Sequence, residues 1–132
     1  MFGLHRKKPP PIRSLVCEGT AVQDHMRFVE GLRIDGEVQG DVTCEGEHSL
    51  LVISEKARVC GKVKAGHVII NGEVRGPITA LALLELQPKA RITGDVRYEL
   101  LEMHQGALVE GELRPLKSSD KPALKLAASN DA

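Results

Sequence analysis

Large aromatic side chains are almost absent from this sequence. Phe, Tyr and Trp together make up 2% of the 132 residues, and Trp does not occur. A core of large rings is therefore excluded, although hydrophobic residues are plentiful at 42%. An interior filled by Val, Ile and Leu suits a narrow, regular fold, because β-branched side chains pack well on a pleated surface. The length is that of one domain.

The chain also lacks an excess of either charge. Its 18 basic residues balance 18 acidic residues, which argues against a general nucleic-acid binder, because such proteins need a basic excess. The three cysteines show no Cys-x-x-Cys spacing, so we expect a reducing compartment and no zinc knuckle. Residues 1–14 hold no apolar run of secretory-signal length, and no stretch approaches the roughly 20 apolar residues of a membrane span. These absences favour a cytoplasmic protein.

A short phrase returns throughout the chain. It reads apolar, polar, Gly, polar, apolar, and its copies are VQGDV at 38–42, VCGKV at 59–63, VRGPI at 74–78, ITGDV at 92–96 and VEGEL at 109–113. Pro77 is the exception among the polar positions, and a weaker sixth copy, VQDHM at 22–26, has Asp24 in place of Gly. The central positions lie 15 to 21 residues apart, about 17 on average. Such a repeat is typical of a solenoid.

The periodicity inside each repeat is that of β-strands. Alternation with period two indicates strands, and no segment keeps helical spacing through the Gly-rich turns. An apolar-x-apolar pair precedes each of the five copies, at Leu32/Ile34, Leu51/Ile53, Val68/Ile70, Leu84/Leu86 and Leu101/Met103. We therefore predict an all-β, single-domain parallel β-helix, a solenoid of about six coils. Its first inward ladder would be Val22, Val38, Val59, Val74, Ile92 and Val109.

Glycine is expected at the corners of the coils. It adopts corner dihedral angles that residues with a Cβ resist, and Asp24 is tolerable because Asp can visit the left-handed region. The linkers before the motif carry Gly when short and Ala when long, at Gly36, Gly72, Ala57, Ala90 and Ala107. The longest interval, 21 residues, would contain a loop, EGEHS at 45–49, that leaves one coil.

Three parts of the chain differ in character. They are a flexible N-terminal arm at 1–14, the β-helix at 15–114 and a disordered C-terminal tail at 115–132 that is rich in Pro, Ser, Lys and Ala. The arm has an apolar tip, a basic cluster and three prolines that forbid a continuing helix or a central strand. It is either a solvated tail or a weak attachment to an anionic membrane surface. The attachment would use Phe2, Leu4, Arg6, Lys7 and Lys8.

No residues point to catalysis, a cofactor or a metal. Carboxylates alternate with Lys and Arg on outward positions, which indicates a solvated convex face rather than a cleft with perturbed acids. No Gly-rich phosphate loop opens a helix. By parity Cys44 faces the core, whereas Cys17 and Cys60 are exposed free thiols. The histidines of the repeats occupy different columns and should be exposed, and one lies in the arm: His25, His48, His67, His104 and His5.

The stretch FVEGLRIDGEVQGDV at 28–42, preceded by CEGTAV at 17–22 and followed by the repeats, resembles the bactofilins, which are bacterial polymer-forming cytoskeletal proteins. The resemblance covers roughly residues 12–114. It implies a right-handed β-helix with a hydrophobic interior, polymerising end to end into non-polar filaments without nucleotide. It also implies flexible tails and a membrane-targeting segment that begins Met-Phe with nearby lysines, which MFGLHRKK at 1–8 matches loosely. Asp24 and the loop at 45–49 depart from the family pattern without threatening the fold.

The sequence thus predicts a structural protein rather than an enzyme. Terminal coils of a solenoid expose strand edges and apolar side chains, and such edges pair with another chain unless they are blocked. No capping pattern separates the end coils from the tails, so we place the polymerisation interface at Val16, Val22, Met26, Leu108, Val109 and Leu113. The expected partners are further copies of the chain, an anionic membrane surface at the inner face of the cytoplasmic membrane, and cell-envelope or cell-wall-modifying proteins. No nucleic acid is expected.

Two alternatives remain open. A monomeric or small-oligomer scaffold would bind a partner through its sides or tails. A left-handed β-helix acyltransferase would need an aliphatic residue at every sixth position, whereas here apolar residues recur two apart and the coil length varies from 15 to 21 residues.

Overall fold

The computed structural model describes residues 10–117, and this part of the chain forms strands and turns without a helix. The strands fall into three groups that follow one another in every coil. The first group is β1 (Ser14–Val16), β4 (Gly31–Ile34), β7 (Leu50–Ile53), the second halves of β9 (Val63–Ile70) and β11 (Ile78–Leu86), and β14 (Leu101–Met103). The second is β2 (Ala21–Val22), β5 (Glu37–Gln39), β8 (Arg58–Cys60), β10 (Glu73–Arg75), β12 (Arg91–Thr93) and β15 (Leu108–Glu110). The third is β3 (Met26–Arg27), β6 (Val42–Thr43), the first halves of β9 and β11, β13 (Val96–Tyr98) and β16 (Leu113–Pro115).

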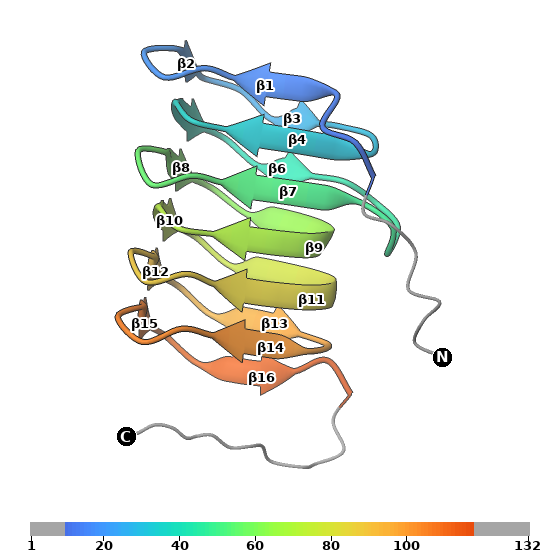
Figure 1. The fold of residues 1–132 in the computed structure, drawn as a ribbon, viewed down its shortest axis with the longest axis vertical. Helices are drawn as coiled ribbons and strands as arrows, with labels where there is room; N and C mark the ends of the chain where they lie inside the picture. The colour runs from blue at the N-terminus through green and yellow to red at the C-terminus, as the bar shows by residue number, and fades with distance from the viewer. Residues whose placement is uncertain (1–9, 118–132) are drawn as a thin grey trace.

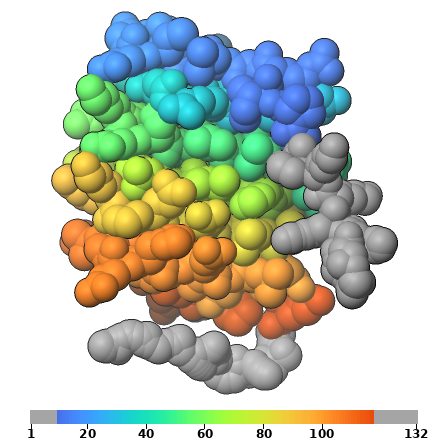
Figure 2. Space-filling view, in the orientation of Figure 1, coloured from blue at the N-terminus to red at the C-terminus, as the bar shows by residue number. Residues whose placement is uncertain are grey.

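Each group stacks into a parallel sheet along one face of the coil. In Figure 1 the strands of the front face run from right to left, and the chain returns behind them while it moves down the view, so the coil is right-handed. The space-filling view shows the coils packed as successive layers (Figure 2). The predicted parallel β-helix of about six coils is confirmed. Because the coil is right-handed, it does not have the left-handed β-helix fold of the acyltransferase alternative.

The predicted inward ladder is also confirmed. Val22 pairs with Val38, Val38 with Val59, Val59 with Val74, Val74 with Ile92, and Ile92 with Val109. The apolar-x-apolar pairs stack in the same way along the first group, and the last residue of each motif forms the third ladder: Met26, Val42, Val63, Ile78, Val96 and Leu113. Side chains in the middle coils of all three ladders are fully buried. The core is thus a column of aliphatic side chains.

The motif glycines form a column at one corner of the coil. A Cβ on Gly61 would lie 2.2 Å from the carbonyl oxygen of Gly40, and the φ angle of Gly61 is +156°. Asp24 stands at the start of this column, and within the described part of the chain no earlier coil presents a carbonyl to it. The expectation that Asp24 adopts a left-handed conformation is wrong, because the non-Gly residue with positive φ in the described chain is Glu30. A side chain is tolerated at position 24 because it meets no preceding coil.

A second corner carries the linkers, and their two lengths are as predicted. The turns with Ala close through a backbone hydrogen bond, for example from Ala57 N to Ser54 O over 3.0 Å, and Ala57 is buried. The loop at 45–49 leaves the coil between β6 and β7, as expected. It is fastened by Ser49, whose buried hydroxyl accepts a 2.8 Å hydrogen bond from the amide of Gly66.

The third corner does not follow from the sequence pattern. In the middle of the rod β9 and β11 run through it as continuous strands, although their pairing shifts register between Ala80 and Leu83. The small residues Ala65 and Ala80 pair there with full burial. Cys44 is buried in the same column, as parity predicted, since its amide hydrogen-bonds to Lys64 next to Ala65. Nearer the two ends the column holds the rings of Phe28 and Tyr98. The two aromatic rings thus lie toward the ends of an otherwise small-residue corner.

The Gly column gives the first prediction. Gly61→Ala places a methyl group on a backbone carbonyl that cannot rotate away, and it also demands a φ that Ala avoids. We expect a loss of roughly 2–4 kcal/mol in the free energy of unfolding, measured by thermal or urea denaturation. Gly19→Ala is the matched control, because Gly19 has a φ of +89° but nothing within 4 Å of the position that a Cβ would take; it should lose only about 1–2 kcal/mol. Equal losses would show that dihedral strain, not coil contact, requires Gly in the column.

Candidate functional site

Within residues 10–117, nothing stacks on the last coil, which therefore ends all three inward ladders. Leu101, Val109 and Leu113 take the same inward positions as fully buried residues one coil earlier. Leu113 nevertheless keeps 38% of its surface exposed, and Met103 keeps 45%. The C-terminal face of the rod is therefore an apolar surface made of core positions.

The backbone at this end is equally open. Among the described residues, β14, β15 and β16 each pair with a strand on one side only, so their outer C=O groups and, except at Pro115, their outer N–H groups face the end of the rod. Such edges accept another strand unless charge, proline or a covering element blocks them. In the described chain no helix covers either end. The C-terminal face can therefore bind through backbone as well as side chains.

The N-terminal face is better covered. Val22 and Met26 are half-buried in the first coil, as predicted for an uncovered end. The expectation of half coverage is wrong for Val16, which is only 5% exposed because it lies inside the core cluster and pairs with Ile34. The two ends of the rod thus differ in which side chains stay exposed, because the N-terminal end exposes Ile12 and Leu15 while it buries Val16.

Leu108 lies apart from the other predicted interface residues. It pairs with Arg91 on the outer side of the sheet, and 61% of its surface is exposed. Its side chain lines an open groove of about 930 Å³ that runs along the corner of the long and short turns. Leu108 therefore borders both the end face and the side of the rod.

The charges in this groove already neutralise one another. Arg58 lies 3.7 Å from Glu37 and 3.3 Å from Glu73, on the strands either side of it. Lys89 donates a 2.7 Å hydrogen bond to Glu55. Hydrogen bonds from Arg75 and Lys89 hold the pKa values of Glu73 and Glu55, respectively, below their usual range. Carboxylates held ionised in this way do not serve as general acids at neutral pH.

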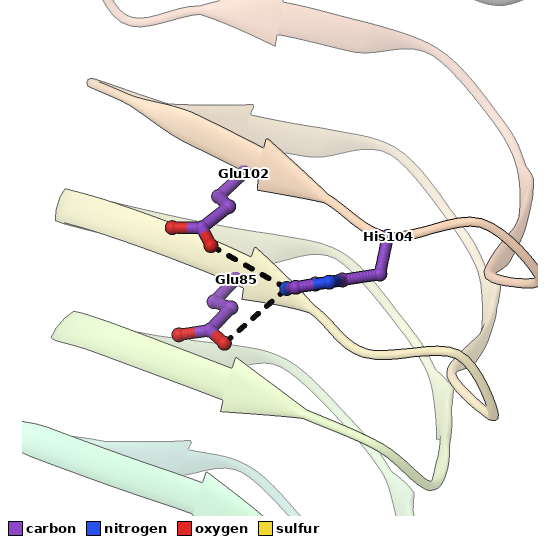
Figure 3. Close-up of side chains that lie close together, drawn as sticks. All are labelled: Glu85, Glu102 and His104. Atoms are coloured by element: carbon purple, nitrogen blue, oxygen red, sulfur yellow. Dashed lines mark ion pairs between the residues drawn. The ribbon is translucent and has the colours of Figure 1, made fainter.

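The outer face near the C-terminal end brings together a group that the sequence analysis missed. Glu85 on β11 and Glu102 on β14 lie directly opposite each other, and His104 follows β14. The Nε2 atom of His104 is 3.5 Å from a carboxylate oxygen of Glu85 and 3.4 Å from one of Glu102 (Figure 3). The columns of the histidines alone do not reveal this group, because two of its three members are carboxylates. The repeat register carries the signal, since it aligns Glu85 with Glu102.

The other histidines and thiols follow prediction in part. His25 and His48 are exposed, as are His104 and Cys17. Cys60 is half-buried rather than exposed, because it lies between Gln39 and Arg75 on neighbouring strands.

The prediction that His67 is exposed is wrong. It sits between Leu50 and Leu83 of the adjacent coils, and its Nε2 atom is buried without a hydrogen-bond partner. Burial lowers the pKa of His67, while the negative charges of Glu85 and Glu102 oppose this shift.

The predicted membrane-targeting residues Phe2, Leu4, Arg6, Lys7 and Lys8 lie outside the described residues. Within residues 10–117 we find no helix of the length and hydropathy needed to cross a membrane.

The burial of His67 gives a pH prediction. Its pKa in the folded chain is below that of the unfolded chain, so the unfolded state binds the proton more readily, and His67 costs stability as pH falls below about 6.5. His67→Leu should be more stable than wild type by on the order of 1 kcal/mol at pH 7.5, because an unpartnered polar atom is removed. The difference should widen at pH 5. Urea denaturation at both pH values measures it, and a constant difference would contradict the assigned cause.

Comparison with known protein families matches residues 14–114 to the family described as Bactofilin, polymer-forming cytoskeletal. No curated protein and no solved structure gives a significant match. The matched residues make up more than half of the chain and coincide with the stacked strands from Ser14 to Pro115. The chain therefore belongs to the bactofilin family, whose members are polymer-forming cytoskeletal proteins.

Proposed function

We propose that the chain assembles end to end into non-polar filaments without a nucleotide. The observation that carries this proposal is the uncovered C-terminal coil, whose inward residues repeat the core but remain exposed at Met103 and Leu113. A second rod supplies what the next coil would have supplied, namely apolar cover and strand pairing. The polymer-forming character of the family supports self-association.

We propose that two rods meet through identical ends at each junction of the filament. A contact between identical faces needs only self-complementarity, so two different ends give two different junctions and a filament without polarity. The inequality of the ends fits this arrangement, because Met103 and Leu113 are exposed at one end while Val16 is buried at the other. Head-to-tail stacking would instead require the two unlike faces to match.

Pro115 bears on how the C-terminal face would pair. Glu112 accepts a hydrogen bond from Val96, and the amide of Leu116 donates to Tyr98, so alternate residues of this segment face β13. Position 115 faces the open side by the same alternation, and proline has no N–H to donate there. Backbone pairing at the junction would therefore rest mainly on β14 and β15, with Val109 and Leu113 providing apolar contact.

The interface prediction compares two substitutions in one ladder. Val109→Asp puts a charge in the proposed junction, where burial without a partner is costly, so filaments should be lost while the β-structure remains. Val74→Asp puts the same charge at a fully buried position and should unfold the rod, because the cost is comparable to the whole stability of a domain. Circular dichroism and sedimentation, without added nucleotide, measure both effects.

The outcomes separate the candidate functions. A folded Val109→Asp protein that still forms full-length filaments would move the contacts to the sides of the rod. Wild-type protein that stays monomeric at physiological salt would favour the scaffold alternative, and pelleting that requires ATP or GTP would contradict passive assembly through strand edges.

The second part of the proposal concerns the N-terminal arm. We propose that Phe2 and Leu4, with Arg6, Lys7 and Lys8, attach the filament to the anionic inner face of the cytoplasmic membrane, where it serves as a scaffold for cell-envelope or cell-wall-modifying proteins. An apolar tip next to basic residues suits such a surface. One arm binds weakly, but a filament presents many arms, and linked sites gain affinity through effective concentration.

Replacing both Phe2 and Leu4 by Ser should release filaments from anionic vesicles by at least about tenfold, since multivalent binding multiplies each small loss. Co-sedimentation with vesicles measures binding, and electron microscopy checks that filaments persist. Unchanged binding after the double replacement would identify the arm as a solvated tail.

A further inference from the structure

The pair Glu85 and Glu102 departs from the alternating charges found on the second face of the rod. On the second face, residues stacked in one column alternate in sign as Glu37, Arg58, Glu73 and Arg91. On the first face, two carboxylates stand directly opposite each other on β11 and β14. Like charges in that position destabilise a sheet.

No lysine or arginine within residues 10–117 forms an ion pair with either carboxylate; the cation within reach is the imidazole of His104. A neutral imidazole offers a lone pair instead of a charge. The site then contains two carboxylates and one nitrogen lone pair that converge on the same space, which is a cation-binding arrangement.

The distances suit a transition-metal ion. In a tetrahedral zinc site with bonds of about 2.0–2.1 Å, neighbouring ligand atoms are about 3.3–3.4 Å apart. The Nε2 atom of His104 is already 3.5 and 3.4 Å from the two carboxylate oxygens (Figure 3). All three ligand atoms lie within 4.8 Å of one another. The side chain of Glu102 is 55% exposed, so its rotation can bring the carboxylate to the distance that zinc requires.

Glu85 is the more restrained ligand. Its side chain is only 20% exposed, and the side-chain amide of Gln87 donates a 3.4 Å hydrogen bond to it. Hydrogen bonds of this kind orient a ligating carboxylate. Glu85 is thus the ligand held in place, and the more exposed Glu102 and His104 are the ligands that can move toward it.

We propose that Glu85, Glu102 and His104 bind a Zn²⁺ ion, with the fourth position open to water. This departs from the absence of a metal site expected from the sequence. The mixed nitrogen and oxygen ligands favour zinc over Mg²⁺ or Ca²⁺, which take six or more oxygen ligands. Since Glu85 belongs to the fifth coil and the other two ligands to the sixth, the ion fastens the terminal coil to the one before it.

Calorimetric titration of the full chain with Zn²⁺ at pH 7.5 tests the site. A Cys17→Ser background is needed, because an exposed thiol such as that of Cys17 can bind zinc by itself. We expect one Zn²⁺ per chain at this site, bound at least about tenfold more weakly by Glu85→Gln and by His104→Gln, because loss of even an outer partner costs 10–100-fold. Zinc should raise the Tm of the parent but not of these variants.

His25→Gln is the matched control. His25 also lies near a carboxylate, 3.7 Å from Asp41, but belongs to no group of three ligands in the described chain. It should bind zinc like the parent, and circular dichroism checks that all variants are folded. Equal zinc affinity in the parent, Glu85→Gln and His104→Gln would place the bound metal elsewhere and overturn the proposal. Binding of Mg²⁺ as tight as that of Zn²⁺ would overturn it as well.

Discussion

The close approach of backbone at the Gly corner is the constraint on which the rod depends. In this column, each coil places a carbonyl oxygen 2.1–2.5 Å from the position that a Cβ would take on the motif glycine of the next coil. Only this contact lets the coils keep the strand spacing of about 4.8 Å on the adjoining faces. The same spacing brings Val59 onto Val38 and Val63 onto Val42, so core packing and backbone pairing share one geometric requirement. A side chain at Gly61 would separate both ladders together.

The repeat made most of the fold predictable, because it fixes which residues stack. Alternation assigned the inward residues, and the spacing of the motifs assigned their neighbours in adjacent coils. The third corner could not be predicted, since nothing in the sequence shows that β9 and β11 pass through it without a turn. His67 was wrongly predicted to be exposed because its burial comes from Leu50 and Leu83 in the coils on either side. Alternation within one strand does not reveal these neighbours.

The site was predictable in its outline but not in its details. The uncovered inward positions at Val109 and Leu113 follow from the repeat simply ending. That Val16 is buried, and that the ends differ, depends on how completely the first coil closes. The Glu85, Glu102 and His104 group needed two pieces of information at once. The repeat aligns the two carboxylates, but the direction in which His104 leaves β14 is a property of the turn.

In the proposed assembly, folding and association use the same kind of contact at the end of the rod. A middle coil is stabilised from both sides, whereas the last coil has a neighbour on one side only. Leu113 shows the consequence, because it takes the place of the fully buried Val96 yet remains partly exposed. A second rod on this face would bury the same positions by the same apolar contact that joins one coil to the next. The proposed junction would therefore need no separate binding chemistry, and whatever fastens the sixth coil to the fifth would also preserve the surface through which we propose that the chain polymerises.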